Sequence, residues 1–216
     1  MKVINQTHEI LSVPENALQM VEAAGRTCYK SEDKITPESA AGFVKMLVRH
    51  GHHAMIEFGD IIVRFTTNRG VTHELVRHRL CSFAQESTRY VRYDGNMEFI
   101  RPVWGSDPLV GEWSPDTPVP ESLPVAEQVW LKGLQQIESD YQALMAHGWK
   151  AQQAREILPN SLKTEIVVKA NIREWRHIFA LRCAKASHPQ IVALMRALLK
   201  EIQEKIPVVF DDLNFS

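Results

Sequence analysis

The chain has 216 residues, of which 25 are lysine or arginine and 26 are aspartate or glutamate, so its formal net charge is -1 at pH 7. This length allows one substantial hydrophobic core, and because no linker-like break divides the sequence, we expect a single domain over residues 1–216. A non-specific nucleic-acid-binding protein usually carries a basic excess, so the balanced charge argues against that class and favours a small anionic ligand.

The cysteines predict a reducing environment. Cys28, Cys81 and Cys183 are odd in number, widely spaced and without a CxxC pair, so no disulfide framework is indicated. The N-terminal residues lack the apolar run of a signal peptide, and no stretch approaches the roughly 18 apolar residues of a membrane helix. We therefore expect a cytoplasmic protein with no membrane partner.

In the first half of the chain, hydrophobic spacing and capping residues predict strands and helices in alternation. We expect a strand within residues 2–13, a helix from Pro14 to Gly25, a helix from Thr36 to about Gly51, and a strand over 61–67. In the second of these helices Thr36 would be the cap, with Pro37 at the first position. Thr72 would cap a short helix that leads directly into Arg77.

The second half begins with two predicted strands and ends in helices. In order, we expect strands over 89–93 and 97–100, a proline-rich surface excursion at 102–124, a long helix over 124–148, a helical turn over 151–158, a strand over 164–170, a helix after Asn171, a break at Ser187–Pro189 and a final helix to about Lys205. The excursion holds six prolines, which favours an irregular connection.

The least ordinary stretch is Glu74 to Tyr90. It places Arg77, Arg79 and Arg89 near a histidine, two hydroxyls and a carboxamide. Several guanidinium groups in one short segment suit an anionic, planar ligand, because each is a flat array of donors that stays charged. The alternative is a solvated basic surface, which is the common role of a charge run. The nearby neutral hydrogen-bonding side chains favour the ligand site.

Other catalytic patterns are missing from the sequence. It contains no GxSxG elbow, P-loop, GxGxxG or HExxH pattern. His50, His52 and His53 raise the possibility of a metal site, but no fourth ligand is evident nearby, which favours a ligand-lining role for His52. Cys81 lies beside the arginines, where its thiol pKa would fall, but a buried apolar role is favoured for it. A site rich in arginine without a nucleophile suits chemistry performed by an organic cofactor.

The arginine motif resembles a known family. Arg77-His78-Arg79, seven further residues and then Ser87, followed by Arg89, resemble the signature of flavin-dependent thymidylate synthases. The resemblance spans roughly residues 17 to 190 and includes the segments Ala23 to Tyr29, His50-Gly51-His52 with Glu57, Arg155 to Pro159, and Asn171 to Arg173 with His177 and Arg182.

This resemblance implies both a fold and a reaction. The fold would be α+β, a mixed sheet flanked by helices, assembled as a homotetramer with active sites at subunit interfaces. The reaction would be reductive methylation of dUMP to dTMP. Methylenetetrahydrofolate would supply the carbon, NADPH the reducing equivalents and FAD the hydride relay, without an enzymatic cysteine and without a metal.

It also implies roles for individual residues. FAD would be bound by His52, Ala54, Arg77, His78, Arg79, Gln85, Asn171, Ile172, Arg173 and His177. dUMP would be bound by Glu74, Arg77, Gln85, Glu86, Ser87, Thr88, Arg89, Arg155 and Arg182, with Arg155 coming from another subunit. Arg182 would be catalytic, because a fixed guanidinium beside the uracil favours ionisation at N3. Ala54 and Glu74 depart from the hydroxyl and the glutamine that are common in the family.

Two other functions stay open at this point. A non-catalytic nucleotide- or RNA-binding module could use the same arginines, and a metal hydrolase could be built around His50–His53. Bound flavin distinguishes the enzyme from the binding module, and bound zinc distinguishes the hydrolase.

Overall fold

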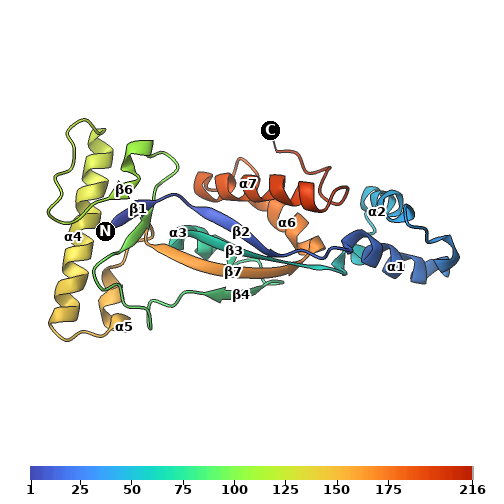
Figure 1. The fold of residues 1–216 in the computed structure, drawn as a ribbon, viewed down its shortest axis with the longest axis horizontal. Helices are drawn as coiled ribbons and strands as arrows, with labels where there is room; N and C mark the ends of the chain where they lie inside the picture. The colour runs from blue at the N-terminus through green and yellow to red at the C-terminus, as the bar shows by residue number, and fades with distance from the viewer. Residues whose placement is uncertain (216) are drawn as a thin grey trace. The chain divides into compact units, whose positions relative to one another are not determined.

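The computed structural model describes residues 1–215, which form the mixed α+β arrangement expected from the sequence, with two sheets and flanking helices (Figure 1). The strands are β1 (Lys2–Ile4), β2 (Thr7–Ser12), β3 (Asp60–Asn68), β4 (Ser82–Gln85), β5 (Glu98–Ile100), β6 (Gly111–Glu112) and β7 (Lys163–Asn171). The α-helices are α1 (Ala17–Tyr29), α2 (Ser39–Arg49), α3 (Arg69–Leu75), α4 (Val125–Ala146), α5 (Ala151–Ala154), α6 (Ile172–Arg182) and α7 (Pro189–Lys205). The 3-10 segments are η1 (Glu32–Lys34), η2 (His53–Glu57), η3 (Asp107–Leu109) and η4 (Arg155–Ile157).

The chain divides into two compact units. Unit 1 consists of residues 1–7, 65–75 and 84–166, and unit 2 consists of residues 8–64, 76–83 and 167 onward. One sheet has the strand order β5-β1-β6, and the other has the order β2-β3-β7-β4. Each strand of the second sheet begins in one unit and ends in the other. The single domain expected from the sequence stays a prediction.

Unit 1 has its own hydrophobic core beside the three-stranded sheet. Strand β1 pairs in parallel with β5 and antiparallel with β6. Leu131, Leu134 and Tyr141 lie on the buried face of α4, at the helical spacing expected for a face that packs on a core. The buried members of this core are Met1, Val3, Met97, Phe99, Leu109, Trp113, Leu123, Leu131, Leu134, Tyr141, Ala154 and Leu162.

A buried ion pair joins the start of β1 to α4. The N-terminal ammonium of Met1 donates to Glu138 Oε2 at 2.6 Å, and the two groups are 0% and 1% exposed. The other carboxylate oxygen of Glu138 accepts from Met97 N at 2.9 Å. Because hydrogen bonds satisfy both oxygens, this charge is tolerated inside unit 1.

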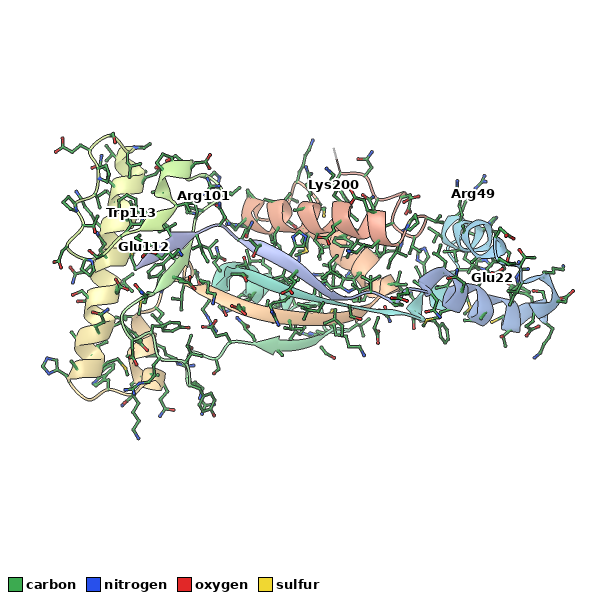
Figure 2. The ribbon with its side chains drawn as sticks, viewed as in Figure 1. Glu22, Arg49, Arg101, Glu112, Trp113 and Lys200 are labelled. Carbon is green, nitrogen blue, oxygen red and sulfur yellow. The ribbon has the colours of Figure 1, made fainter. Side chains whose placement is uncertain are left out.

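The connection over residues 102–124 is irregular, as its prolines predict, but its centre is packed into unit 1. Strand β6 pairs with β1, and Trp113, at the end of β6, donates its backbone N–H to Met1 O at 2.8 Å. The indole N–H of Trp113 donates to Leu109 O at 2.8 Å. Trp113 and Glu112 therefore lie beside β1 (Figure 2). The predicted surface excursion therefore applies to the two ends of this segment, whereas its middle is packed into unit 1.

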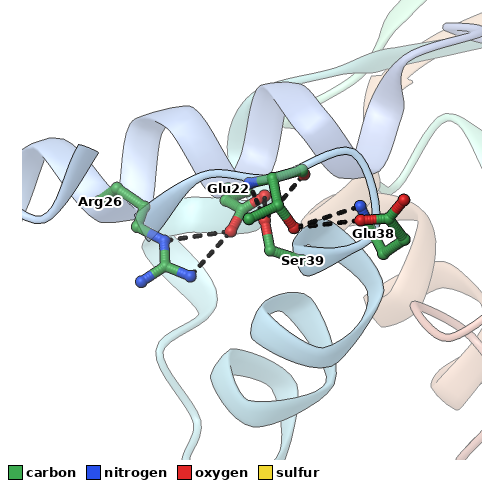
Figure 3. Close-up of polar contacts among 5 residues, drawn as sticks. Glu22, Arg26, Glu38 and Ser39 are labelled. Atoms are coloured by element: carbon green, nitrogen blue, oxygen red, sulfur yellow. Dashed lines mark hydrogen bonds and ion pairs between the residues drawn. The ribbon is translucent and has the colours of Figure 1, made fainter. Parts of the chain in front are cut away.

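In unit 2, a polar cluster links α1 to α2. Glu22 is buried; its Oε1 accepts from Arg26 Nε and Nη2 at 3.0 and 2.9 Å, and its Oε2 accepts from Ser39 Oγ at 2.8 Å (Figure 3). The prediction that Gly25 ends the first helix is wrong, because α1 continues to Tyr29. A Cβ at residue 25 would lie 2.6 Å from a ring carbon of Phe43. Glycine is therefore needed there for close helix packing.

Two helix starts also differ from the sequence prediction. Helix α2 begins at Ser39 instead of Pro37, and Thr36 N donates to Ser39 Oγ at 2.9 Å. Helix α3 begins at Arg69, and Asn68 provides the cap in place of Thr72, since Asn68 Oδ1 accepts from Val71 N at 2.9 Å. Both differences are of a kind expected when several polar residues compete for the cap.

Residues 89–93, all described by the structure, form turns and loop, so the strand predicted there is wrong. The strand in this region is β4, which precedes them and borders β7 in the sheet. The predicted long helix and the strands at 61–67 and 164–170 are confirmed as α4, β3 and β7.

Helix α6 packs on β3 within unit 2. The indole N–H of Trp175 donates to Ile61 O at 3.1 Å, and the ring of Trp175 lies 5.7 Å from that of Phe179. Phe179 in turn meets Phe210 edge-on at 5.8 Å. This buried aromatic series fixes α6, whose two ends carry the residues discussed next.

Candidate functional site

The arginine motif contributes to both units. Unit 2 contains the predicted flavin-binding residues apart from Gln85, namely His52, Ala54, Arg77, His78, Arg79, Asn171, Ile172, Arg173 and His177. Unit 1 contains the predicted dUMP-binding residues apart from Arg77 and Arg182, namely Glu74, Gln85, Glu86, Ser87, Thr88, Arg89 and Arg155.

His78 is the buried centre of the unit 2 residues. Helix α3 ends at Leu75, whereas the predicted helix led directly into Arg77, and the turn after it places His78 where the residue is 5% exposed. His78 Nε2 accepts from Arg182 Nε at 3.0 Å, and His78 Nδ1 lies 3.5 Å from Glu174 Oε1. The ring of His177 meets that of His78 edge-on, with centroids 5.6 Å apart. Both ends of α6 thus contribute a side chain to His78.

Burial and charge keep His78 neutral. Burial, the Arg182 guanidinium and His177 lower the pKa of His78 from an ordinary 6.5 to about 4. Burial raises the pKa of the Glu174 carboxyl, and the charges of His177 and Arg173 oppose that rise. Near neutral pH, His78 is therefore an uncharged imidazole with one N–H donor and one acceptor.

Asn171 positions the start of α6. It ends β7, and its Oδ1 accepts from Glu174 N at 2.9 Å as the helix cap. The next residue, Ile172, is fully buried and donates its backbone N–H to Gly59 O at 3.0 Å. The sequence predicted a helix after Asn171, and the cap explains why it begins there.

A cavity of about 730 Å³ opens beside this helix start. It is lined by His53, Ile56, Glu57, Leu80, Asn171, Arg173, Glu174, Arg176, His177, Ala180 and Leu213. Arg173 Nη1 donates to Glu57 Oε1 at 2.6 Å, and the Arg176 guanidinium donates to both carboxylate oxygens of Asp212 at 2.6 and 2.7 Å. The hydrogen bond from Arg176 lowers the pKa of Asp212. Apolar and cationic groups therefore share one concave surface.

Some predicted flavin-binding residues line this cavity and others do not. Asn171, Arg173 and His177 do, whereas His52, Ala54, Ile172 and the three motif residues Arg77, His78 and Arg79 are outside its lining. Sequence reasoning missed Glu174 and Arg176 as lining residues. The three-residue spacing between Glu174 and His177 puts both on one face of a helix, and this was the available signal.

Three side chains with metal-binding atoms lie together in the part of the chain that the structure describes. They are His78, Glu174 and His177, whose ligand atoms are all within 4.8 Å of one another. The histidines at positions 50–53, around which the hydrolase alternative was built, are not in such a group among residues 1–215. His50 Nδ1 instead lies 2.9 Å from Met46 O at the end of α2.

The thiols near the motif are held protonated. Burial, together with the negative charge of Glu174, raises the pKa of Cys81 to about 12. Burial also raises the pKa of Cys183 to about 11. The fall in thiol pKa that arginine neighbours would cause at Cys81 does not occur, and the role of a buried small side chain fits better.

In unit 1, hydrogen bonds fix the side chains at the end of β4. Gln85 Nε2 donates to Thr72 Oγ1 at 2.9 Å and lies 3.4 Å from Thr164 Oγ1. Glu86 Oε1 accepts from Tyr93 OH at 2.7 Å, and its other oxygen lies 3.6 Å from Lys163 Nζ. Burial and the bond to Glu86 raise the pKa of Tyr93. The carboxylate of Glu86 thus has partners within the protein.

The turn after Glu86 is organised around Ser87. Ser87 O accepts from Tyr90 N at 3.1 Å and from Val91 N at 3.0 Å, and Arg89 N donates to Ser87 Oγ at 3.4 Å. Thr88 is buried, while Arg89 is exposed with its guanidinium carbon 5.4 Å from the Tyr90 ring centroid. The other unit 1 residues expected to bind dUMP, Glu74 and Arg155, are partly buried.

Comparison with known proteins identifies the family. A family model described as "Thymidylate synthase complementing protein" matches residues 9–208. The chain belongs to this family. A flavin-dependent thymidylate synthase of Corynebacterium diphtheriae is 34% identical over 200 residues, which cover 91% of this chain and 79% of that protein. A flavin-dependent thymidylate synthase of Mycobacterium tuberculosis is 31% identical over 202 residues, with 90% and 79% covered. The resemblance seen in the sequence is confirmed.

A solved structure shares the fold of this member of the thymidylate synthase complementing protein family. It is a UMP/dUMP methylase, PolB, from Streptomyces cacaoi bound with 5-Br dUMP, with a TM-score of 0.76 and 23% sequence identity. The match covers 98% of this chain and 96% of the other. Among the residues described, none of the helices combines the length and apolar character needed to cross a bilayer.

Proposed function

We propose that this protein converts dUMP to dTMP by reductive methylation, with methylenetetrahydrofolate as carbon donor, NADPH as reductant and FAD as the bound hydride carrier. The observation that carries this proposal is the extent of the family match. Residues 9–208 include the whole motif from Arg77 to Arg89 and also Arg182 on the late helix. The arginine motif and the late helix, the two regions that would bind the ligands, therefore both lie within the matched residues.

The unit 2 cavity suits a flavin. Its volume of about 730 Å³ lies within the usual range of ligand pockets. The guanidinium of Arg173 suits a pyrophosphate, and Ile56, Leu80 and Ala180 offer apolar contact for a ring system. Asn171, Arg173 and His177 would hold FAD there, and FAD, when bound, would supply hydride transfer.

Arg182 would be the catalytic residue. A guanidinium fixed beside the pyrimidine stabilises the negative charge that develops on N3, which makes the ring more electron-rich at C5. The hydrogen bond from Arg182 Nε to His78 supports this role, because a preorganised charge need not be reoriented during the reaction.

The nucleotide would be bound by the unit 1 residues. Ser87 and Arg89 would lie near its phosphate, with Gln85, Glu86 and Thr88 around them and Glu74 beside Arg77. The Glu86 carboxylate already has Tyr93 and Lys163 as partners, and its backbone N–H donates to Glu165 O at 2.9 Å. Arg155 would reach dUMP from another subunit of a homotetramer.

Neither Cys81 nor Cys183 would attack the pyrimidine. Cys81 and Cys183 have pKa values raised to about 12 and about 11, so both remain protonated at neutral pH and are poor nucleophiles. This fits a reaction in which carbon transfer does not need an enzymatic cysteine.

The test is an assay with the purified protein. NADPH oxidation should depend on dUMP, and dTMP should form only when methylenetetrahydrofolate is present. The protein should also show flavin absorbance and release FAD on denaturation. A colourless protein that takes up no FAD and forms no dTMP would refute the enzyme, and dUMP binding without turnover would favour a non-catalytic nucleotide-binding module.

A further inference from the structure

Glu174 is a buried carboxylate without a role in the reaction described above. It lies in the first turn of α6, is 6% exposed and has its backbone N–H bound by the cap Asn171. Because burying a carboxylate is costly, a Glu at this position needs a compensating interaction. Its side chain points to His78, with Oε1 3.5 Å from Nδ1.

The two contacts of His78 define which nitrogen carries its proton. Arg182 Nε can only donate, so His78 Nε2, 3.0 Å away, must be the acceptor. A neutral imidazole then has its single proton on Nδ1, the nitrogen that faces the Glu174 carboxylate. Donation from Arg182 and acceptance by Glu174 therefore favour the same tautomer.

We propose that Glu174 is a positioning residue for Arg182 and acts through His78. The carboxylate holds the His78 ring in its Nδ1–H tautomer and orientation, and the ring then presents Nε2 to Arg182 Nε and fixes the direction of the guanidinium. A carboxylate that orients a histidine in this way is a recurrent arrangement in enzymes. The effect on turnover rests on the proposed function, whereas the tautomer does not.

A metal site is the other possible use of this cluster, since His177 is also within reach. The neighbouring charges argue against it. Arg182 donates to one nitrogen of His78, and the positive charge of Arg173 acts on the Glu174 carboxyl. The positive charges of Arg173 and Arg182 repel a divalent cation placed between them, whereas the charge of Arg173 favours the ionised carboxylate that faces His78 Nδ1.

Two substitutions distinguish the effect of the carboxylate as a hydrogen-bond acceptor from the effect of side-chain size. Glu174→Met keeps a long side chain but removes the acceptor, and we expect kcat to fall roughly 10- to 100-fold. Glu174→Gln retains an acceptor oxygen, and its loss should be smaller. In both variants kcat should fall by a larger factor than the KM for dUMP rises, because Glu174 acts on Arg182 through His78. Since Glu174 also lines the proposed flavin cavity, turnover is expressed per bound flavin.

The matched control is Glu201→Gln. Glu201 is a second carboxylate paired with a histidine, His8, at 3.0 Å, but it lies on α7 and is 42% exposed. Its substitution should leave kcat unchanged. Wild-type kcat in Glu174→Met, or an equal fall in Glu201→Gln, would overturn the proposal.

The tautomer is read directly from the side-chain ¹⁵N signals of the full-length protein, with His78 assigned from its absence in His78→Gln. We expect protonated Nδ1 and unprotonated Nε2 in wild type, and a mixture of the two tautomers in Glu174→Met, because only Arg182 then favours one of them. A wild-type His78 protonated on Nε2 refutes the relay even if no variant folds. Stoichiometric zinc uptake that Glu174→Met abolishes would replace the relay by a metal site. Failure to form dTMP refutes the proposed function alone.

Discussion

The buried His78 should make the stability of the fold depend on pH. Its pKa is about 4 in the folded protein and near 6.5 when the ring is exposed. Between these values the unfolded chain binds more protons, so the stabilisation is complete above pH 6.5 and is lost as the pH falls towards 4. At pH 5 the difference in proton binding lowers the free energy of unfolding by about 2 kcal/mol.

The substitution His78→Gln isolates this effect. Its amide oxygen can still accept from Arg182 Nε, but the side chain does not titrate. Urea unfolding at pH 7.5 and pH 5, at one fixed protein concentration, should show that wild type loses about 2 kcal/mol more than the variant. The raised pKa of Glu174 acts with the opposite sign, but Glu174 is present in both proteins, as are Arg182 and His177.

An exposed histidine provides the control. His50 lies on the surface at the end of α2, so His50→Gln removes one histidine but leaves the buried cluster of His78, Glu174 and Arg182 intact. His78→Gln should therefore change the pH dependence of stability more than His50→Gln does. If His78→Gln and wild type lose the same stability between the two pH values, burial does not perturb His78 as argued. An NMR titration of His78 with a midpoint near 6.5 would lead to the same conclusion.

Three further substitutions test separate parts of the argument. Arg182→Ala should keep its flavin absorbance while kcat for dTMP formation falls about 10²- to 10³-fold, the effect of removing one preorganised donor; full activity would refute the catalytic role. Cys81→Ser should retain turnover in the same assay, because a thiol with a pKa of about 12 is no nucleophile, and selective loss of activity in the folded variant would contradict this. Glu138→Ala leaves the buried Met1 ammonium unpaired and should lower the free energy of unfolding by about 3–5 kcal/mol. The control Glu112→Ala removes a carboxylate that is 70% exposed and should change stability by at most about 1 kcal/mol; equal effects would contradict the burial argument.

Elements with a strong local pattern could be predicted from the sequence. Helix α4 has apolar residues at helical spacing over its whole length, and β3 is rich in β-branched residues, so both elements could be recognised from their local sequence. Strand β4 has no such pattern and exists because β7 borders it in the sheet. The segment at 89–93 has the better strand composition but lacks a partner strand in the part of the chain that the structure describes, so composition alone misleads there.

Gly25 shows the same limitation for a single residue. In the sequence it looks like a helix terminator, but the helix ends at Lys30 in the left-handed conformation. The glycine is needed because Phe43, from another helix, occupies the space that a side chain would fill. A contact between residues 18 positions apart leaves no local signal.

The residues of the candidate site also differ in whether the sequence could reveal them. The arginine motif is contiguous and could be found by its spacing, whereas the carboxylates that contact Arg173 and His78 come from distant parts of the chain. Glu57 accepts a hydrogen bond from Arg173, which is 116 positions away in the sequence. From the sequence alone, Glu174 is only an acidic residue in the first turn of a helix. Such pairings follow from tertiary packing and have no periodic pattern.

The polar side-chain pairs of unit 2 differ in how easily a ligand could replace one partner. Arg173 and Glu57 are 51% and 45% exposed, and a pair in that setting contributes about 0–1 kcal/mol. An anionic ligand can therefore take the place of Glu57 at little cost, which makes Arg173 suitable as a binding group. The His78 and Glu174 side chains are 4% and 8% exposed, so separating them leaves a buried carboxylate without a partner, at far greater cost. His78 is thus suited to hold Arg182 in place, and direct contact with a flavin would require its ring to become accessible first.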